Sequence, residues 1–190
     1  MCLQKFQMPK PITILGRSSS ITNAFINGIV PCVSPTEDEV KHALELLGMN
    51  ADTICCSYCG DTYTEWDHLN PLILNKKATG YISEINNLVP SCGKCNQSKG
   101  NKQWKDWILS DAKLSPKSRR ISDLEQRIER LEIYESQMHP TKIDFELLVG
   151  DEKWETYWSA WGRLLDEMSE AQKLSSEIKK IVLNTYRDKK

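Results

Sequence analysis

Two Cys-x-x-Cys pairs constrain the fold of this 190-residue chain more than any other feature. The pairs are Cys56–Cys59 and Cys92–Cys95, and their first members are 36 residues apart. One such turn presents two thiolates to one ion, so two turns complete a tetrahedral zinc site with Zn–S distances of about 2.3 Å. A redox dithiol would favour a single pair in a thioredoxin-like setting. We therefore expect a structural Zn²⁺ that ties together the segment between the pairs.

The composition fits a globular protein in a reducing compartment. Hydrophobic residues make up 39% of the chain and charged residues 27%. No apolar run is long enough to span a membrane, and the first residues lack the apolar stretch of a signal peptide. We expect a cytoplasmic location, where paired cysteines hold metal more often than they form disulfides.

Charge is unevenly distributed, although the net charge is only −1. Residues 74–120 contain ten basic and three acidic side chains. A basic segment that overlaps a metal motif suits a phosphate-bearing partner. The alternative is an ordinary solvated helical face, which a charge run taken alone more often indicates.

The pattern along the chain predicts an α+β fold, mostly helical around a small core. Residues 16–20 and 27–28 look loop-like, and Ser34 with Glu37 predicts a capping box that opens a helix ended by Gly48. Short strands are expected over 62–66 and 87–91, with a helix over 93–99 that Gly100 stops. The rest of the chain reads as helical. Its stripes are Trp104, Trp107 and Ile108; Leu124, Ile128, Leu131 and Tyr134 after a capping box at 122–125; and Trp154, Trp158, Trp161, Leu165, Met168, Leu174, Ile178 and Ile181.

Several motifs in order resemble the HNH nuclease motif, the zinc-stapled four-cysteine branch of the ββα-metal endonucleases. They are the first Cys-x-x-Cys, residues 66–72 (WDHLNPL), residues 87–92 (NLVPSC) and residues 95–102 (CNQSKGNK). The resemblance covers roughly residues 52–103. It implies a ββα core, a DNA substrate, and products with a 5′-phosphate and a 3′-hydroxyl.

The resemblance also implies a role for each matching residue. His68 corresponds to the general base that activates water, and Asp67 to a carboxylate ligand of a catalytic divalent ion. Asn87 corresponds to the asparagine that braces the histidine loop, and Asn96 to the second metal ligand. The family places histidine or asparagine at this last position, so Asn96 bears on metal preference more than on activity.

The chemistry of these side chains agrees with those roles. Histidine is best poised to take a proton near neutral pH, and a carboxylate with an amide oxygen suits Mg²⁺ or Mn²⁺. Because Asp67 and His68 are adjacent, a regular strand would point them to opposite faces. We therefore expect the chain to leave strand geometry there. Taken alone, His68 would more often be a hydrogen-bonded structural histidine.

The flanks carry no assignable chemical motif. We divide the chain into residues 1–51, which hold a DNA-contact region, the nuclease core at 52–103, and a helical region at 104–190 for DNA binding or dimerisation. The candidate DNA contacts are Lys94, Lys99, Lys102, Arg17 and Asn23. An ordinary polar loop around Arg17 and Asn23 is about as good an interpretation.

These features favour a metal-dependent endonuclease of double-stranded DNA, of restriction type by analogy. The alternatives are a nicking nuclease of a mobile element or phage, and a non-catalytic zinc module that binds nucleic acid. Because one such site cuts one strand, a double-strand break predicts a homodimer. The apolar stripes at 124–134 and 154–181 could form its interface, unless they pack within one monomer.

Overall fold

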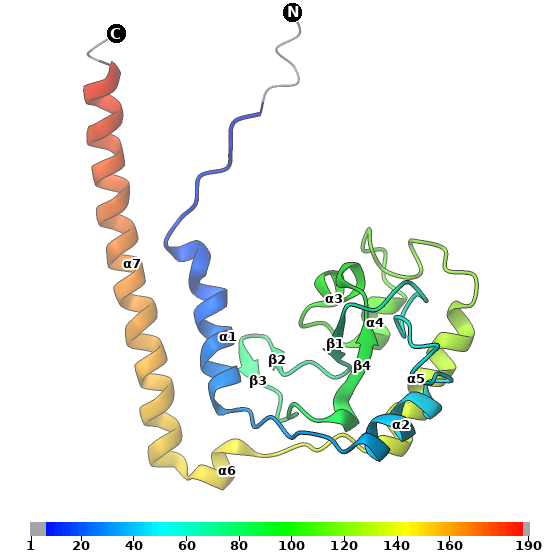
Figure 1. Cartoon of the computed structure of the whole chain (residues 1–190). Coiled ribbons are helices and arrows are strands. Elements are labelled where there is room, and N and C mark those ends of the chain that lie inside the picture. The colour runs from blue at the N-terminus through cyan, green and yellow to red at the C-terminus, as the bar shows by residue number, and fades with distance from the viewer. Residues whose placement is uncertain (1–6, 188–190) are drawn as a thin grey trace, which may run out of the picture. The chain divides into compact units, whose positions relative to one another are not determined.

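The computed structural model describes residues 7–187, which contacts divide into two units (Figure 1). One unit comprises residues 7–25 and 149–187, and the other comprises residues 26–148. This grouping follows contacts, so the three-segment division at residues 51 and 103 stays a functional prediction. None of the helices in the described range is both long enough and apolar enough to cross a membrane.

The first unit pairs an N-terminal helix with the long C-terminal one. A 3-10 turn, η2 (Leu15–Arg17), leads into α1 (Ser18–Ile29), which packs along the first half of α7 (Asp151–Arg187). The hydroxyl of Tyr157 donates to the Phe25 carbonyl at 2.7 Å, and the Trp161 indole donates to Thr22 at 3.2 Å. Trp161 of the predicted stripe therefore serves helix packing, whereas Leu174, Ile178 and Ile181 further along α7 are exposed.

Residues 16–20 and 27–28 were expected to be loop-like, and this prediction was wrong for residues 18–20 and 27–28, which lie in α1. Serine, threonine, asparagine and glycine are poor helix formers. Packing outweighs this weak propensity here, since Thr22 and Ile26 are buried on the inner side of α1.

The second unit contains a ββα core. Strand β1 (Glu65–His68) pairs antiparallel with β4 (Leu88–Ser91), with Asp67 opposite Val89 and His68 opposite Leu88. A 3-10 turn, η3 (Ile85–Asn87), feeds β4, and α3 (Gly93–Lys99) follows it directly. Gly100 ends α3 with a φ of +50°, as predicted. The first strand begins three residues later than the expected segment 62–66.

The segment between the strands contains a small hairpin instead of the expected continuous loop. Strands β2 (Ile73–Leu74) and β3 (Lys77–Ala78) pair antiparallel around Asn75 and Lys76. Both turn residues have positive φ, which matches the twist of a two-residue hairpin. Two lysines, Lys76 and Lys77, thereby project at the exposed tip.

Three helices from outside the motif cover the ββα core. They are α2 (Glu37–Leu46), α4 (Trp104–Ile108) and α5 (Leu124–Met138), and the unit ends in α6 (Phe145–Val149). Trp104, Trp107 and Ile108 are all buried, as the predicted stripe requires. On α5, Leu131 and Tyr134 are fully buried, with Leu124 and Ile128 packed against the same core. That stripe therefore packs within the monomer, which was the alternative to a dimer interface.

Of the two predicted capping boxes, one lies two residues further along the chain and the other is absent. The box of α2 is formed by Thr36 and Glu39, because the helix begins two residues beyond Pro35. At α5 the N-cap residue is Asp123, whose side chain makes no capping hydrogen bond. Its carboxylate instead binds Arg127 at 2.7 Å. Gly48 does follow the end of α2 with a φ of +71°, as predicted.

Candidate active site and zinc cluster

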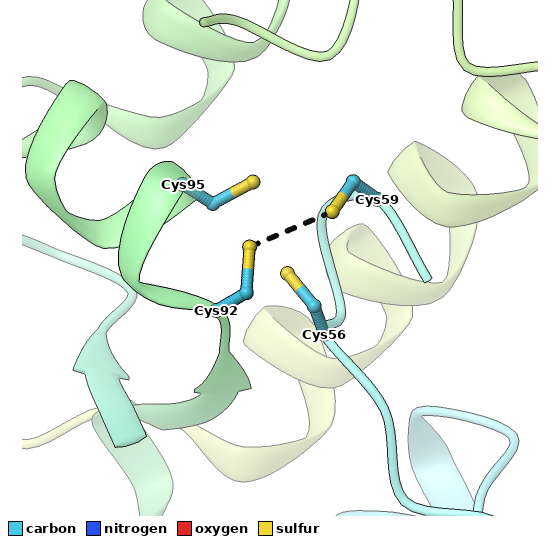
Figure 2. Close-up of side chains that lie close together, drawn as sticks. All are labelled: Cys56, Cys59, Cys92 and Cys95. Carbon is cyan, nitrogen blue, oxygen red and sulfur yellow. Dashed lines mark hydrogen bonds between the residues drawn. The ribbon is translucent and has the colours of Figure 1, made fainter. Parts of the chain in front are cut away.

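The four cysteines of the paired motif converge on one point (Figure 2). Their sulfur atoms lie within 4.8 Å of one another, and the Sγ atoms of Cys59 and Cys92 are 3.7 Å apart. Sulfurs placed 2.3 Å from an ion at tetrahedral corners are separated by about 3.8 Å. All four side chains are buried. Cys56, Cys59, Cys92 and Cys95 thus fit a structural zinc ion, as the spacing predicted.

Two arginines outside the motif support the cluster. Arg119 donates to Cys95 Sγ at 3.4 Å and binds the Asp61 carboxylate at 2.9 Å. From α5, Arg127 donates to the Cys56 carbonyl at 3.1 Å. Four thiolates around Zn²⁺ carry a net charge of −2, so nearby guanidinium groups favour the loaded site.

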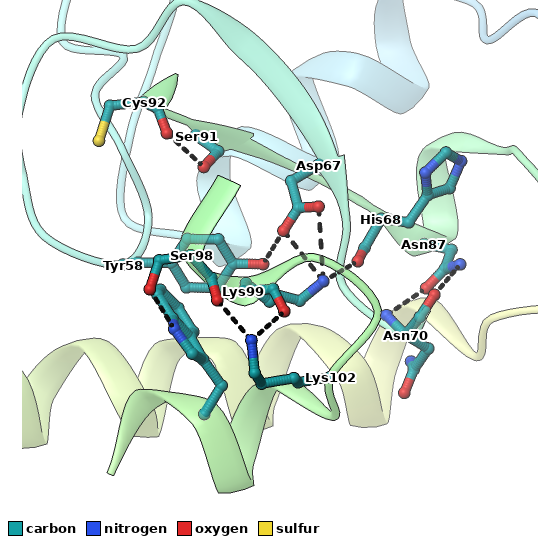
Figure 3. Close-up of polar contacts among 11 residues, drawn as sticks. Tyr58, Asp67, His68, Asn70, Asn87, Ser91, Cys92, Ser98, Lys99 and Lys102 are labelled. Carbon is teal, nitrogen blue, oxygen red and sulfur yellow. Dashed lines mark hydrogen bonds and ion pairs between the residues drawn. The ribbon is translucent and has the colours of Figure 1, made fainter. Parts of the chain in front are cut away.

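Asp67 points into the protein from β1 and lies in a buried polar cluster (Figure 3). The hydroxyl of Tyr58 donates to Asp67 Oδ2 at 2.7 Å, and the Lys99 ammonium is 3.1 Å from the same oxygen. Lys99 also donates to the His68 carbonyl at 2.6 Å. The ring of Tyr58 packs edge-on against Trp107. Lys99 thereby links α3 to β1.

Burial opposes ionisation at each member of this cluster. It raises the pKa of Asp67, which Lys99 and Tyr58 partly counteract. It lowers the pKa of Lys99, which Asp67 partly counteracts. Burial also raises the pKa of Tyr58 well above its usual value, so the phenol keeps its proton and donates to Asp67. The charges of Asp67 and Lys99 depend on each other.

His68 is the last residue of β1, and its side chain points away from the Asp67 carboxylate (Figure 3). The expectation that the chain leaves strand geometry at this dipeptide was wrong, because β1 stays paired with β4 through His68. Nε2 of the imidazole lies 2.9 Å from Ser83 Oγ. Burial, with a smaller contribution from the Lys99 charge, lowers the pKa of His68 to about 4. The ring is therefore neutral near pH 7.

Asn87 is fully buried and clamps the loop that follows His68. Its amide oxygen accepts from the Asn70 N–H at 2.9 Å, and its Nδ2 donates to the Asn70 carbonyl at 3.0 Å. Nδ2 also lies 3.4 Å from the Ile82 carbonyl. The side chain thus joins the segment after His68 to the segment before Ser83. This geometry is a bracing arrangement of the kind implied for Asn87.

Asp67 and Asn96 carry oxygen atoms suited to a divalent ion, but the Asp67 carboxylate already binds other side chains. Asn96 is half-buried on α3, three residues before Lys99, and Asp67 faces α3. A carboxylate and an amide oxygen are hard ligands suited to Mg²⁺ or Mn²⁺. In the structure Lys99 and Tyr58 bind the Asp67 carboxylate. An ion at Asp67 would therefore compete with the Lys99 ammonium.

The predicted DNA contacts fall into three groups. Lys99 was proposed to face DNA, and the structure corrects this: its side chain is 1% exposed and committed to the ion pair. Lys94 and Lys102 are exposed at the two ends of α3. Arg17 and Asn23 are exposed on η2 and α1, in the other unit.

Sequence reasoning missed Tyr58, Ser83 and Arg119. Tyr58 occupies one of the two free positions inside the first Cys-x-x-Cys, where any residue is allowed. Ser83 and Arg119 lie outside every motif, and only folding brings them to His68 and Cys95. No local sequence pattern identifies any of these three residues as part of the site.

Comparison with known proteins matches residues 56–102 to the family model of the HNH endonuclease. Searches of curated proteins and of solved structures returned no match. The matched segment begins at the first zinc ligand and ends three residues after Lys99. It contains the four cysteines, Asp67, His68, Asn87 and Asn96.

Proposed function

Because residues 56–102 form an HNH endonuclease domain, we propose that this protein is a metal-dependent endonuclease that hydrolyses phosphodiester bonds in double-stranded DNA. The observation that carries the proposal is the setting of His68. A neutral, half-buried imidazole ends a strand inside a zinc-stapled core. Among the described residues, Nε2 bonds Ser83 and no partner occupies Nδ1.

In the proposed reaction His68 takes a proton from the attacking water. Asp67 and Asn96 are the candidate ligands of a divalent ion that would neutralise charge at the phosphoryl group. Because β1 directs the Asp67 and His68 side chains apart in the structure, the Asp67 carboxylate would have to turn away from Lys99 to serve the same phosphate. Asn87 keeps the loop after His68 in place through its two hydrogen bonds to Asn70. In the structure Lys99 offsets the Asp67 charge.

The basic segment at 74–120 supports DNA as the substrate. Lys94 and Lys102 flank α3, while Lys76 and Lys77 form the hairpin tip between the catalytic strands. Side chains of this kind contact phosphates and give salt-dependent, sequence-independent affinity. Raising the salt concentration should therefore weaken binding steeply.

We propose double-strand cleavage of restriction type as the biological role, by two copies of the chain. The rival is a nuclease that nicks one strand, as in mobile elements or phages. A pure zinc-dependent binding module is disfavoured because it needs no base at His68. Digesting a sequenced supercoiled plasmid with Mg²⁺ separates the three: linear product, nicked circle, or a mobility shift without cleavage.

The decisive variant is His68→Ala, with His42→Ala as its matched control. His42 is exposed on α2 in the same unit and lies outside the candidate site. Removing a general base lowers the rate about 10²- to 10⁴-fold. We expect His68→Ala to lose cleavage while it keeps its zinc and its DNA affinity, and His42→Ala to match the unmodified protein. Equal cleavage rates in the two variants would refute the assignment.

A further inference from the structure

We propose that Ser83 is a positioning residue for His68. Its hydroxyl oxygen accepts a hydrogen bond from Nε2–H, which leaves the Nδ1 lone pair free to take the proton from water. The segment at 31–33 would then belong to the catalytic apparatus, because it holds Ser83. This inference rests on the proposed function. Ser83 is not one of the residues to which the family resemblance gives a role.

The contact itself is short and shielded. Nε2 of His68 and Oγ of Ser83 are 2.9 Å apart, and both side chains are half-buried. A hydroxyl can accept or donate, so the distance alone allows either tautomer of the ring. A base must present an unprotonated nitrogen to its substrate. Nε2 faces Ser83, so only Nδ1 can serve, and the proton must then reside on Nε2.

The backbone of Ser83 is fixed by the stretch after α1. Its N–H donates to the Pro31 carbonyl at 3.1 Å, and its carbonyl accepts from the Val33 N–H at 2.8 Å. Both backbone groups of Ser83 are therefore satisfied by one short segment, which forms a parallel bridge at Cys32. A hydroxyl carried on such a backbone has little freedom to leave the imidazole.

Asn87 fixes the same contact from the other side. Its amide binds Asn70, two residues after His68, and its Nδ2 reaches the carbonyl of Ile82, the neighbour of Ser83. The two halves of the His68–Ser83 pair are thus joined through one buried side chain. The backbone bonds of Ser83 and the side chain of Asn87 therefore restrict the His68–Ser83 contact from two directions.

The tautomer can be read directly in the unmodified protein. The full chain, loaded with zinc, is labelled with ¹⁵N in its three histidines. The His68 signals are assigned from their absence in His68→Ala. We expect imidazole ¹⁵N shifts of the Nε2–H form at neutral pH. An Nδ1–H form would overturn the proposal without any variant of Ser83.

Kinetics of Ser83→Ala, Ser83→Thr and the control Ser136→Ala complete the test. Within residues 7–187, the Ser136 hydroxyl has Ile133 as its one hydrogen-bond partner, at an exposed site on α5. A neutral hydrogen bond of this kind corresponds to about a threefold to tenfold effect. We expect Ser83→Ala to lose that much in kcat, with DNA affinity and zinc content unchanged and the Nε2–H preference weakened. Ser83→Thr keeps the hydroxyl and should retain most of kcat.

The outcomes separate this inference from the function it rests on. Unchanged kcat and an unchanged tautomer in Ser83→Ala, together with an inactive His68→Ala, would refute the role of Ser83 and leave the nuclease assignment intact. Cleavage by His68→Ala would refute the assignment, while the tautomer measurement would still report the contact. If Ser83→Ala loses its zinc, the role of Ser83 is tested instead by the tautomer of His68 in the unmodified protein and by the kcat of Ser83→Thr.

Discussion

Replacing Lys99 by methionine tests the buried ion pair that joins α3 to β1. The substitution keeps the length of the side chain and removes its charge. It leaves the Asp67 carboxylate, 7% exposed, with the Tyr58 hydroxyl as its remaining partner. It also removes the donor to the His68 carbonyl.

The magnitude follows from the geometry. Unit charges 3.1 Å apart attract by about 5 kcal/mol at an effective dielectric constant of 20. Burial opposes both charges, as the raised pKa of Asp67 and the lowered pKa of Lys99 show. Breaking such a pair by removing one partner typically costs about 3–5 kcal/mol, because the other charge stays buried. For a chain of this size the loss lowers Tm by about 6–20 °C.

The assay is thermal and urea unfolding of the full chain at a fixed zinc concentration. Asp67→Asn and the double variant complete a mutant cycle, since the asparagine oxygen can still accept from Tyr58. We expect Lys99→Met to lose about 3–5 kcal/mol and the double variant to regain more than half of that. A loss below about 1 kcal/mol, or no recovery in the double variant, would show that the pair does not stabilise the fold.

The loss should also depend on pH, with a sign fixed by Asp67. Without Lys99 the folded-state pKa of Asp67 stands further above its unfolded value of 3.8, because desolvation remains and the main opposing influence is gone. A raised carboxyl pKa favours folding at low pH and disfavours it as pH rises through the folded pKa. The deficit of Lys99→Met relative to the unmodified protein should therefore become smaller as the pH falls from 8 toward the unfolded pKa of 3.8.

Further expectations concern the zinc, the asparagine clamp and the assembly. Cys92→Ser should lower bound zinc, measured by elemental analysis, and lower Tm, because structural zinc binding contributes folding free energy; full Tm without zinc would contradict it. Asn87→Ala should lose about 1–3 kcal/mol in urea unfolding, since the buried backbone groups of Asn70 lose their partners; an unchanged midpoint would argue against the clamp. Light scattering should give twice 21.8 kDa if two copies cut both strands. A monomer mass, free and on DNA, together with nicking as the only activity, would exclude the dimer and the restriction role.

The parts of the fold that local chemistry determines could be predicted from the sequence. The spacing of Cys56, Cys59, Cys92 and Cys95 fixes the cluster, because a two-residue gap brings two thiolates to one ion. The end of α3 follows from Gly100, which adopts a positive φ. The apolar stripes on α4 and α5 could also be predicted, because helical periodicity of apolar residues indicates the buried face.

Features set by tertiary contact could not be predicted. The poor helix formers of α1 are held by Tyr157 and Trp161, more than 130 positions away. The composition of this segment is typical of loops, so the prediction from sequence was wrong there. Lys99 looks like a surface lysine until Asp67 and Tyr58 surround it. The Ser83 contact to His68 spans 15 residues that include an unpredicted hairpin.

The hydrogen bonds from α5 have a consequence for how the nuclease core can be moved between proteins. The Tyr134 hydroxyl donates to the Leu88 carbonyl at 2.8 Å and to the Ile85 carbonyl, while Arg127 reaches Cys56. All three acceptors lie within the matched segment, and both donors lie well beyond its end. Excising residues 56–102 would strip partners from these carbonyls and uncover the apolar side of β4. A graft into another scaffold should therefore carry residues 26–148, the portable module that the contacts define.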